Sequence, residues 1–234
     1  MDKIWLKSYP AGVPAEIDWR EYQSVGDLFA QNCTRFSDRP AFHNMGRSLS
    51  FGELDRMSQA FGAWLQSKGL PKGSRVAIMM PNCLQIPVCL FGALRAGYTV
   101  CNVNPLYTPR ELGHQLKDSG AETIIILENF AHVLQQVLSG TQVKHVVIAA
   151  LGDLLGFKGG IVNFVVRHVK KMVPAWRIDG AERFNAVVEQ GGHLALKPAN
   201  VGPEDVAFLQ YTGGTTGVAK GATLLHRNIL ANLE

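Results

Sequence analysis

Short apolar runs alternate with amphipathic segments along the middle of this 234-residue chain. Four runs have the length of a β-strand, over residues 75–80, 98–103, 122–127 and 145–149, and a fifth covers 206–211. Ile124, Ile125 and Ile126 are consecutive, which predicts a strand buried on both faces. Because single helices fit between the first four runs, the pattern predicts an α/β fold with a mainly parallel sheet flanked by helices.

The helical segments have clear start signals. Ser50 is followed by Glu53 and Thr108 by Glu111, which is the spacing of a capping box, and Ser24 begins another helix. We predict helices over 24–36, 51–68, 84–96, 109–119, 130–138 and 157–173. Between the first two, residues 41–50 predict a small N-terminal hairpin that turns at 45–47.

The two less regular regions lie at residues 1–22 and 150–200. The first has scattered aromatic and proline residues, which predicts an irregular arm that docks through its aromatic side chains. In the second, Gly191-Gly192 and Lys197-Pro198 predict a loop and a subdomain boundary near 191–204.

Composition and charge exclude some classes of function. The net charge is +4, and no Lys/Arg block is interleaved with aromatic residues, so the sequence does not favour nucleic acid as a partner. The four cysteines have no metal-binding spacing and lie among apolar neighbours. Without an apolar signal segment at the N-terminus or a run long enough to span a bilayer, we expect a cytoplasmic protein.

The segment 211–221, YTGGTTGVAKG, follows the last predicted strand directly. Glycines allow consecutive backbone N–H groups to converge on an anion, and threonine hydroxyls and a lysine add further contacts to phosphate. A Walker A loop is excluded because Ala219 precedes Lys220 and Gly221 follows it, and the adjacent Gly213 and Gly214 exclude a dinucleotide fingerprint. On composition alone, a flexible Gly/Thr turn without a ligand is the alternative.

The order of residues in 211–221 resembles the phosphate loop of the adenylate-forming superfamily, although Ala219 stands where the usual pattern has proline. Five other segments are similar to that superfamily, namely 50–54, 75–82, 95–97, 102–108 and 225–228. Together they are most similar to bacterial long-chain fatty acid–CoA ligases. The resemblance covers essentially the whole chain.

This resemblance implies an ATP-dependent ligase that activates a long-chain fatty acid as its acyl-adenylate and then transfers the acyl group to CoA. It implies that the ATP phosphates are bound by Thr212, Gly213, Gly214, Thr215, Thr216, Gly217 and Lys220. Mg²⁺ is expected with the ATP, and Thr216 is the candidate ligand. No catalytic residue is assigned within the chain. His226 follows the loop and is either close to the phosphates or a helix-surface histidine.

The resemblance also implies that residues 1–234 are the N-terminal part of a large AMP-binding domain, and that the small C-terminal domain is absent. We therefore expect this fragment alone to be inactive. Two alternatives stay open: a ligase for another carboxylic acid, and a truncated, non-catalytic binding module.

Two segments are candidates for contacts outside the chain. Residues 157–173 predict a basic amphipathic helix, which favours peripheral contact with the inner face of the cell membrane. The alternative is an ordinary helix that packs its apolar side on the sheet. The N-terminal arm is a candidate contact for a homodimer.

Overall fold

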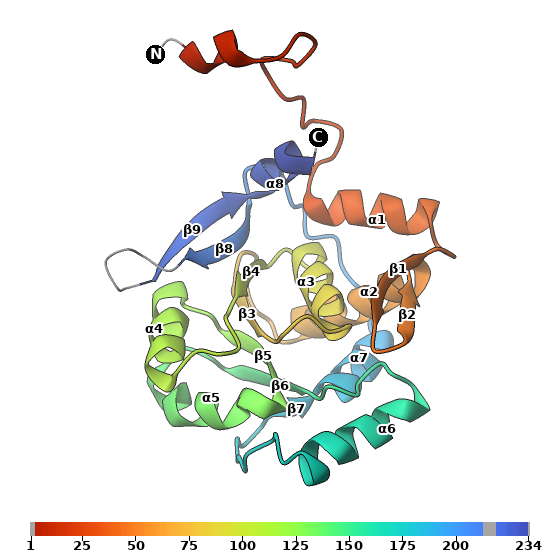
Figure 1. Cartoon of the computed structure of the whole chain (residues 1–234), viewed down its shortest axis with the longest axis vertical. Helices are drawn as coiled ribbons and strands as arrows, with labels where there is room; N and C mark the ends of the chain where they lie inside the picture. Colours follow the sequence, from red (N-terminus) through yellow and green to blue (C-terminus); the bar gives the residue numbers. More distant parts are fainter. Residues whose placement is uncertain (1–2, 213–218, 234) are drawn as a thin grey trace.

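The computed structural model describes residues 3–212 and 219–233 of the chain (Figure 1). In these residues a seven-stranded sheet has the order β7-β6-β5-β3-β4-β8-β9, and only β9 is antiparallel to its neighbour. Its strands are β3 (Arg75–Met79), β4 (Thr99–Asn102), β5 (Thr123–Leu127), β6 (His145–Ala149), β7 (Glu182–Arg183), β8 (Val206–Thr212) and β9 (Lys220–Leu225). A separate hairpin pairs β1 (Pro40–Asn44) with β2 (Arg47–Ser50). The predicted fold class is confirmed.

Helices cover both faces of the sheet. The α-helices are α1 (Val25–Arg35), α2 (Phe51–Ser67), α3 (Gln85–Arg95), α4 (Pro109–Ser119), α5 (Ala131–Val137), α6 (Phe157–Phe164), α7 (Phe184–Gly192) and α8 (His226–Leu233). Short 3-10 segments are η1 (Ile4–Ser8), η2 (Glu128–Phe130) and η3 (Leu138–Gly140), and the π-helical turn η4 (Val165–Val169) continues α6. The predicted helices and strands of residues 24–149 agree with these bounds to within one or two residues.

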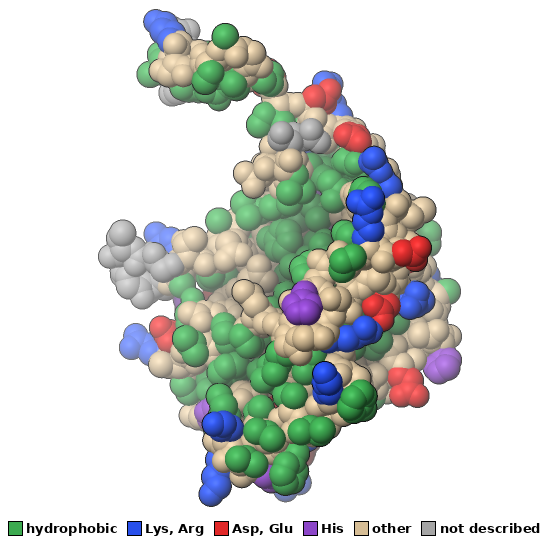
Figure 2. All heavy atoms as spheres, turned by 45° about the vertical axis from the view of Figure 1, so that its right-hand side comes forward, with side chains coloured by type: hydrophobic (Ala, Val, Ile, Leu, Met, Phe, Trp, Pro, Cys, Tyr) green, Lys and Arg blue, Asp and Glu red, His purple; other side chains and the backbone are tan. Residues whose placement is uncertain are grey.

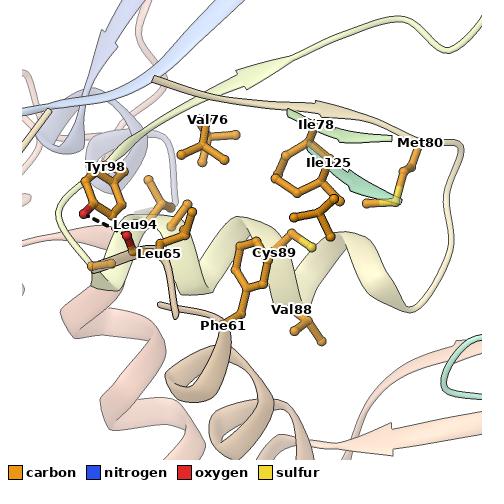
Figure 3. Packing of buried hydrophobic residues seen from close by; sticks show 14 of the residues in the cluster. Phe61, Leu65, Val76, Ile78, Met80, Val88, Cys89, Leu94, Tyr98 and Ile125 are labelled. Carbon is orange, nitrogen blue, oxygen red and sulfur yellow. Dashed lines mark hydrogen bonds between the residues drawn. The ribbon is translucent and has the colours of Figure 1, made fainter. Parts of the chain in front are cut away.

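Two apolar clusters lie on opposite faces of the sheet. On one face, Phe61 and Trp64 of α2 and Cys89 of α3 pack against Ile78 and Ile125 (Figure 3). On the other face, α4 and α5 cover the remaining side chains of the same strands, including Met79, Ile124 and Ile126. Because successive side chains of a strand point to opposite faces, the apolar runs of β3 and β5 supply both clusters.

The predicted helix starts are confirmed in detail. Ser50 Oγ accepts a hydrogen bond from the Glu53 N–H at 3.1 Å, and Glu53 Oε2 accepts one from the Ser50 N–H at 2.9 Å. Thr108 and Glu111 form the second capping box. Ser24 accepts from the Asp27 N–H at 3.0 Å. These bonds satisfy N–H groups that a helix leaves without partners in its first turn.

Two predictions for residues 150–200 were wrong. Gly191-Gly192 lie in the last turn of α7 and not in a loop, because Phe184 and Val187 are buried and hold this helix against the core. The predicted helix over 157–173 ends at Val169, where the chain turns so that the Met172 N–H reaches the Val166 carbonyl. The strands β7 and β9 and the helix α7 were not predicted. The subdomain boundary near 191–204 stays a prediction.

The N-terminal arm docks only through its last part. Trp19 and Tyr22 pack against the core, whereas Trp5 and Tyr9 are exposed. Figure 1 shows the first residues extending away from the body of the molecule. The prediction that the arm docks through its aromatic side chains was therefore wrong for Trp5 and Tyr9. A homodimer contact through the arm stays a prediction.

Candidate phosphate-loop site

The strands β8 and β9 form the hairpin that carries the predicted phosphate loop. Thr212 and Lys220 are opposite each other in the antiparallel pair, and both side chains are exposed. The structure therefore brings together the two ends of the loop. The other predicted phosphate contacts, Gly213, Gly214, Thr215, Thr216 and Gly217, lie outside the described residues, and so does the candidate Mg²⁺ ligand.

A polar pocket of about 430 Å³ lies beside this hairpin, at the carboxyl ends of the parallel strands β4 and β8. Its lining residues are Asn102, Val103, Asn104, Tyr107, Gln210 and Tyr211. Asn102 Nδ2 donates to Gln210 Oε1 at 3.2 Å, which links the two strands at the mouth of the pocket. Open α/β sheets bind ligands at this edge. The sequence analysis did not predict that these residues line one pocket, although the carboxyl ends of two predicted parallel strands were a usable signal.

Helix α4 contacts β8 and the residue directly before β9. Tyr211 Oη donates to Asp118 Oδ2 at 2.5 Å, and His114 Nε2 lies 3.3 Å from the carbonyl oxygen of Ala219. Burial, together with the hydrogen bond to Asp118, raises the pKa of the Tyr211 hydroxyl well above its usual range. Tyr211 is therefore a neutral donor at physiological pH, and it ties β8 to α4.

His226 is buried and lies away from Lys220, the described residue at the end of the loop, so the expected helix-surface location was wrong. Lys220 begins β9 and His226 follows its end, so the two residues are separated by roughly 17–20 Å of extended chain. The imidazole is 1% exposed, and its Nδ1 accepts a hydrogen bond from the Val25 N–H at 3.1 Å. Burial lowers the pKa of His226 to about 4. The side chain thus supports the first turn of α1 in its neutral form.

A buried carboxylate lies at the carboxyl end of β5. Glu128 is 2% exposed and accepts two hydrogen bonds from Arg167, at 2.8 and 2.9 Å, and one from Arg183, at 3.1 Å. Bidentate arginine contacts of this kind fix geometry as well as charge. Since both carboxylate oxygens accept hydrogen bonds, Glu128 links Arg167 of η4 and Arg183 of β7 to the end of β5.

The described residues offer neither a metal-binding cluster nor a membrane-spanning helix. In residues 3–212 and 219–233, no three or more His, Cys, Asp and Glu side chains are grouped so that they could hold a metal ion. Across the same residues, none of the helices combines the length and apolar character needed to cross a bilayer.

A mainly parallel α/β sheet in which a Gly/Thr-rich segment of sequence follows a strand directly is typical of nucleotide-binding proteins. The sequence profile of the family described as AMP-binding enzyme matches residues 29–234, and the chain belongs to that family. The chain is 55% identical over its whole length to a long-chain-fatty-acid–CoA ligase of Escherichia coli and 34% identical over 99% of its length to one of Bacillus subtilis. It spans 42% of the length of the first of these relatives and 41% of the length of the second.

Solved structures support the same fold. A long-chain-fatty-acid–CoA ligase from Archaeoglobus fulgidus matches 96% of this chain with a TM-score of 0.71 and 25% identity, and the match covers 40% of that protein. The resemblance that the motifs indicated is confirmed by these comparisons.

Proposed function

We propose that the protein to which this chain belongs is an ATP-dependent ligase that joins a long-chain fatty acid to CoA through an acyl-adenylate. The observation that carries this proposal is the 55% identity to the Escherichia coli ligase across the entire chain, including the segment between β8 and β9. A ligase for another carboxylic acid is the alternative, and the acid preference in the assay below decides between them.

The chemistry explains why such a loop is needed. A carboxylate is a poor electrophile, and its attack on the α-phosphorus of ATP, with loss of pyrophosphate, converts one of its oxygens into part of a good leaving group. The CoA thiol then attacks the acyl carbon and AMP departs. Charge neutralisation and positioning dominate phosphoryl-transfer catalysis.

Within this chain, we assign phosphate binding to the loop residues named above together with Thr212 and Lys220, which flank them. Lys220 is exposed at the start of β9, so its ammonium is free to approach a bound polyphosphate. Mg²⁺ would neutralise charge on the phosphates, with Thr216 as the proposed protein ligand. Mg²⁺ usually keeps several waters and is bound through one or two carboxylates together with the substrate phosphates.

The first test uses the full-length protein and ATP–pyrophosphate exchange. We expect exchange that depends on a long-chain acid such as palmitate and is much weaker with benzoate. Lys220→Ala should raise the KM for ATP about tenfold, because the variant loses one hydrogen bond from a charged donor. The KM for palmitate should stay unchanged. Lys117→Ala, an exposed lysine on α4, is the matched control. A full-length protein without acid-dependent exchange would refute the proposal, and exchange by residues 1–234 alone would refute the expectation that the fragment is inactive.

We further propose that α6 and the residues after it contact the inner face of the cell membrane. Five large apolar side chains of this segment are more than half exposed: Phe157 (86%), Ile161 (63%), Phe164 (60%), Val169 (63%) and Met172 (58%). Figure 2 shows hydrophobic and basic side chains together at the lower end of the molecule, where α6 lies in Figure 1.

The orientation of this surface supports the proposal. Val162 and Val166 pack inward, and Arg167 is held by Glu128, so the exposed apolar residues are fixed outward. Lys158, Lys170 and Lys171 are exposed in the same segment. An apolar surface with lysines at its border suits a bilayer that contains anionic lipids.

The second test is flotation of the full-length protein with anionic vesicles. Lys170→Glu/Lys171→Glu should lower the vesicle-bound fraction of the protein. The partition coefficient should fall at least tenfold, because each basic residue near an anionic surface contributes about 1 kcal/mol. Lys7→Glu/Lys117→Glu changes the net charge equally at exposed positions outside this segment and is the control. Equal binding of the two double variants would contradict the proposal.

A further inference from the structure

The first and last residues of the loop segment, Tyr211 and Gly221, are opposite each other in the β8–β9 pair. A Cβ atom on Gly221 would lie 3.0 Å from two atoms of the Tyr211 ring and 3.3 Å from its hydroxyl oxygen. The ring therefore lies across the glycine, and a side chain at position 221 would displace it. Glycine at the end of the segment is explained by packing against the tyrosine at its beginning.

The Tyr211 ring continues from this pair toward α4. It packs in the apolar cluster of that face, and its hydroxyl reaches Asp118 at 2.5 Å. The titratable groups that act on the tyrosine hydroxyl are Asp118, Cys101 and Arg75. Since the hydroxyl keeps its proton, the contact is a hydrogen bond from a neutral donor to a carboxylate, which is stronger than one between neutral groups.

Ala219, the residue directly before β9, has its own contact with the same helix. The Ala219 carbonyl can only accept, so His114 donates from Nε2 across 3.3 Å. His114 and Asp118 are four residues apart and thus on one face of α4. One helix face therefore holds the residue before Thr212 and the residue before Lys220.

We propose that Tyr211, Asp118 and His114 are positioning residues that hold the two strands at the base of the phosphate loop in the separation needed to bind ATP. The inference rests on the proposed function for its ligand. The two contacts themselves, Tyr211 with Asp118 and His114 with Ala219, lie within the described residues, and together they are called the clamp. The proposal also gives a role to the contact at Ala219, the position at which the phosphate-loop pattern that this segment resembles has proline. Alanine restricts the backbone less than proline does, and the contact from His114 supplies a restraint at that position.

The test compares Tyr211→Phe, Asp118→Ala, Asp118→Asn and His114→Ala in the full-length protein, with Lys117→Ala as the control on α4. Loss of the hydrogen bond to Asp118 should raise the KM for ATP about tenfold in Tyr211→Phe, with the KM for palmitate unchanged. Asp118→Asn keeps an acceptor oxygen and should recover most of what Asp118→Ala loses. The double variant Tyr211→Phe/Asp118→Ala should be no worse than either single variant.

A second measurement does not depend on activity. Amide hydrogen exchange over 206–212 and 219–225 should become about tenfold faster in Tyr211→Phe than in the unmodified protein, because the hairpin loses its tie to α4. Unchanged hydrogen exchange in Tyr211→Phe would overturn the clamp. Faster hydrogen exchange with an unchanged KM for ATP would overturn its role in ATP binding. If the unmodified protein lacks acid-dependent exchange of pyrophosphate, the proposed function fails, and the hydrogen-exchange result still decides whether the clamp exists.

Discussion

Replacing Gly191 with alanine is expected to lower the free energy of unfolding by about 3 kcal/mol, the upper part of the range for overpacked cores. A Cβ atom at this position would overlap the carbonyl oxygen of Ala60 and lie 2.7 Å from its carbonyl carbon and 3.1 Å from Trp64 Cβ. The obstacle is mainly backbone of α2, so no rotamer change relieves the clash.

The neighbouring glycine provides the control. A Cβ atom on Gly192 meets nothing within 4 Å, and Gly192 is in the same last turn of α7. Gly192→Ala should therefore leave stability unchanged or raise it by up to about 1 kcal/mol, because alanine has the higher helix propensity. Denaturant unfolding followed by circular dichroism measures both. Equal stability of the two variants would show that α7 does not approach α2 as closely as described.

Acidification from pH 6.5 to pH 4 is expected to remove up to about 3 kcal/mol of stability through His226. Its pKa is lowered from 6.5 to about 4 in the folded protein, first by burial and then by Lys72, while Asp205 acts in the opposite direction. Between these two pH values the unfolded chain binds a proton at His226 and the folded chain does not. Stability is therefore fully present above pH 6.5 and is lost as the pH falls toward 4.

The matched variant is His226→Asn, whose side-chain oxygen can accept from the Val25 N–H but does not titrate. The unmodified protein should lose more stability than this variant between pH 6.5 and 4, and the two curves should be parallel above pH 7. The Asp205 carboxyl has a lowered pKa and loses its contribution at lower pH than His226, so the two groups titrate in separate windows. Parallel curves throughout would exclude His226 as the origin.

Local patterns predicted β3, β4, β5, β6 and β8 because each of them is an apolar run bounded by a turn or a cap. The short parallel strand β7 is polar and gave no such signal. The capping residues were equally readable, since Ser50–Glu53 and Thr108–Glu111 act within a few residues of each other. Gly191-Gly192 failed for the opposite reason. Their glycine content is a local turn signal, but here it serves a close approach to α2, more than a hundred residues earlier in the chain.

The candidate site also has one part that local sequence patterns predict and another part that they do not. The loop segment was recognised from its own order of residues, because phosphate binding needs glycines and hydroxyls close together in sequence. Asp118 and His114 had no such signal, since their contacts with Tyr211 and Ala219 span about a hundred residues. The edge strand β9 was missed because its exposed and half-buried positions, KGATLL, lack an apolar run.

The place of β8 in the sheet has a consequence for how the chain is made. β8 pairs with β4, and the Thr99 hydroxyl donates to the Val206 carbonyl at 3.0 Å, yet β4 ends at Asn102 and β8 begins at Val206. About a hundred residues must therefore leave the ribosome after β4, which takes roughly 5–20 s. During this time β3 to β6 can assemble with their helices while β4 remains an unpaired edge. The β8–β9 hairpin can join the sheet only after these strands have been made, so a nascent chain arrested before it would expose the free edge of β4, which can pair with another chain.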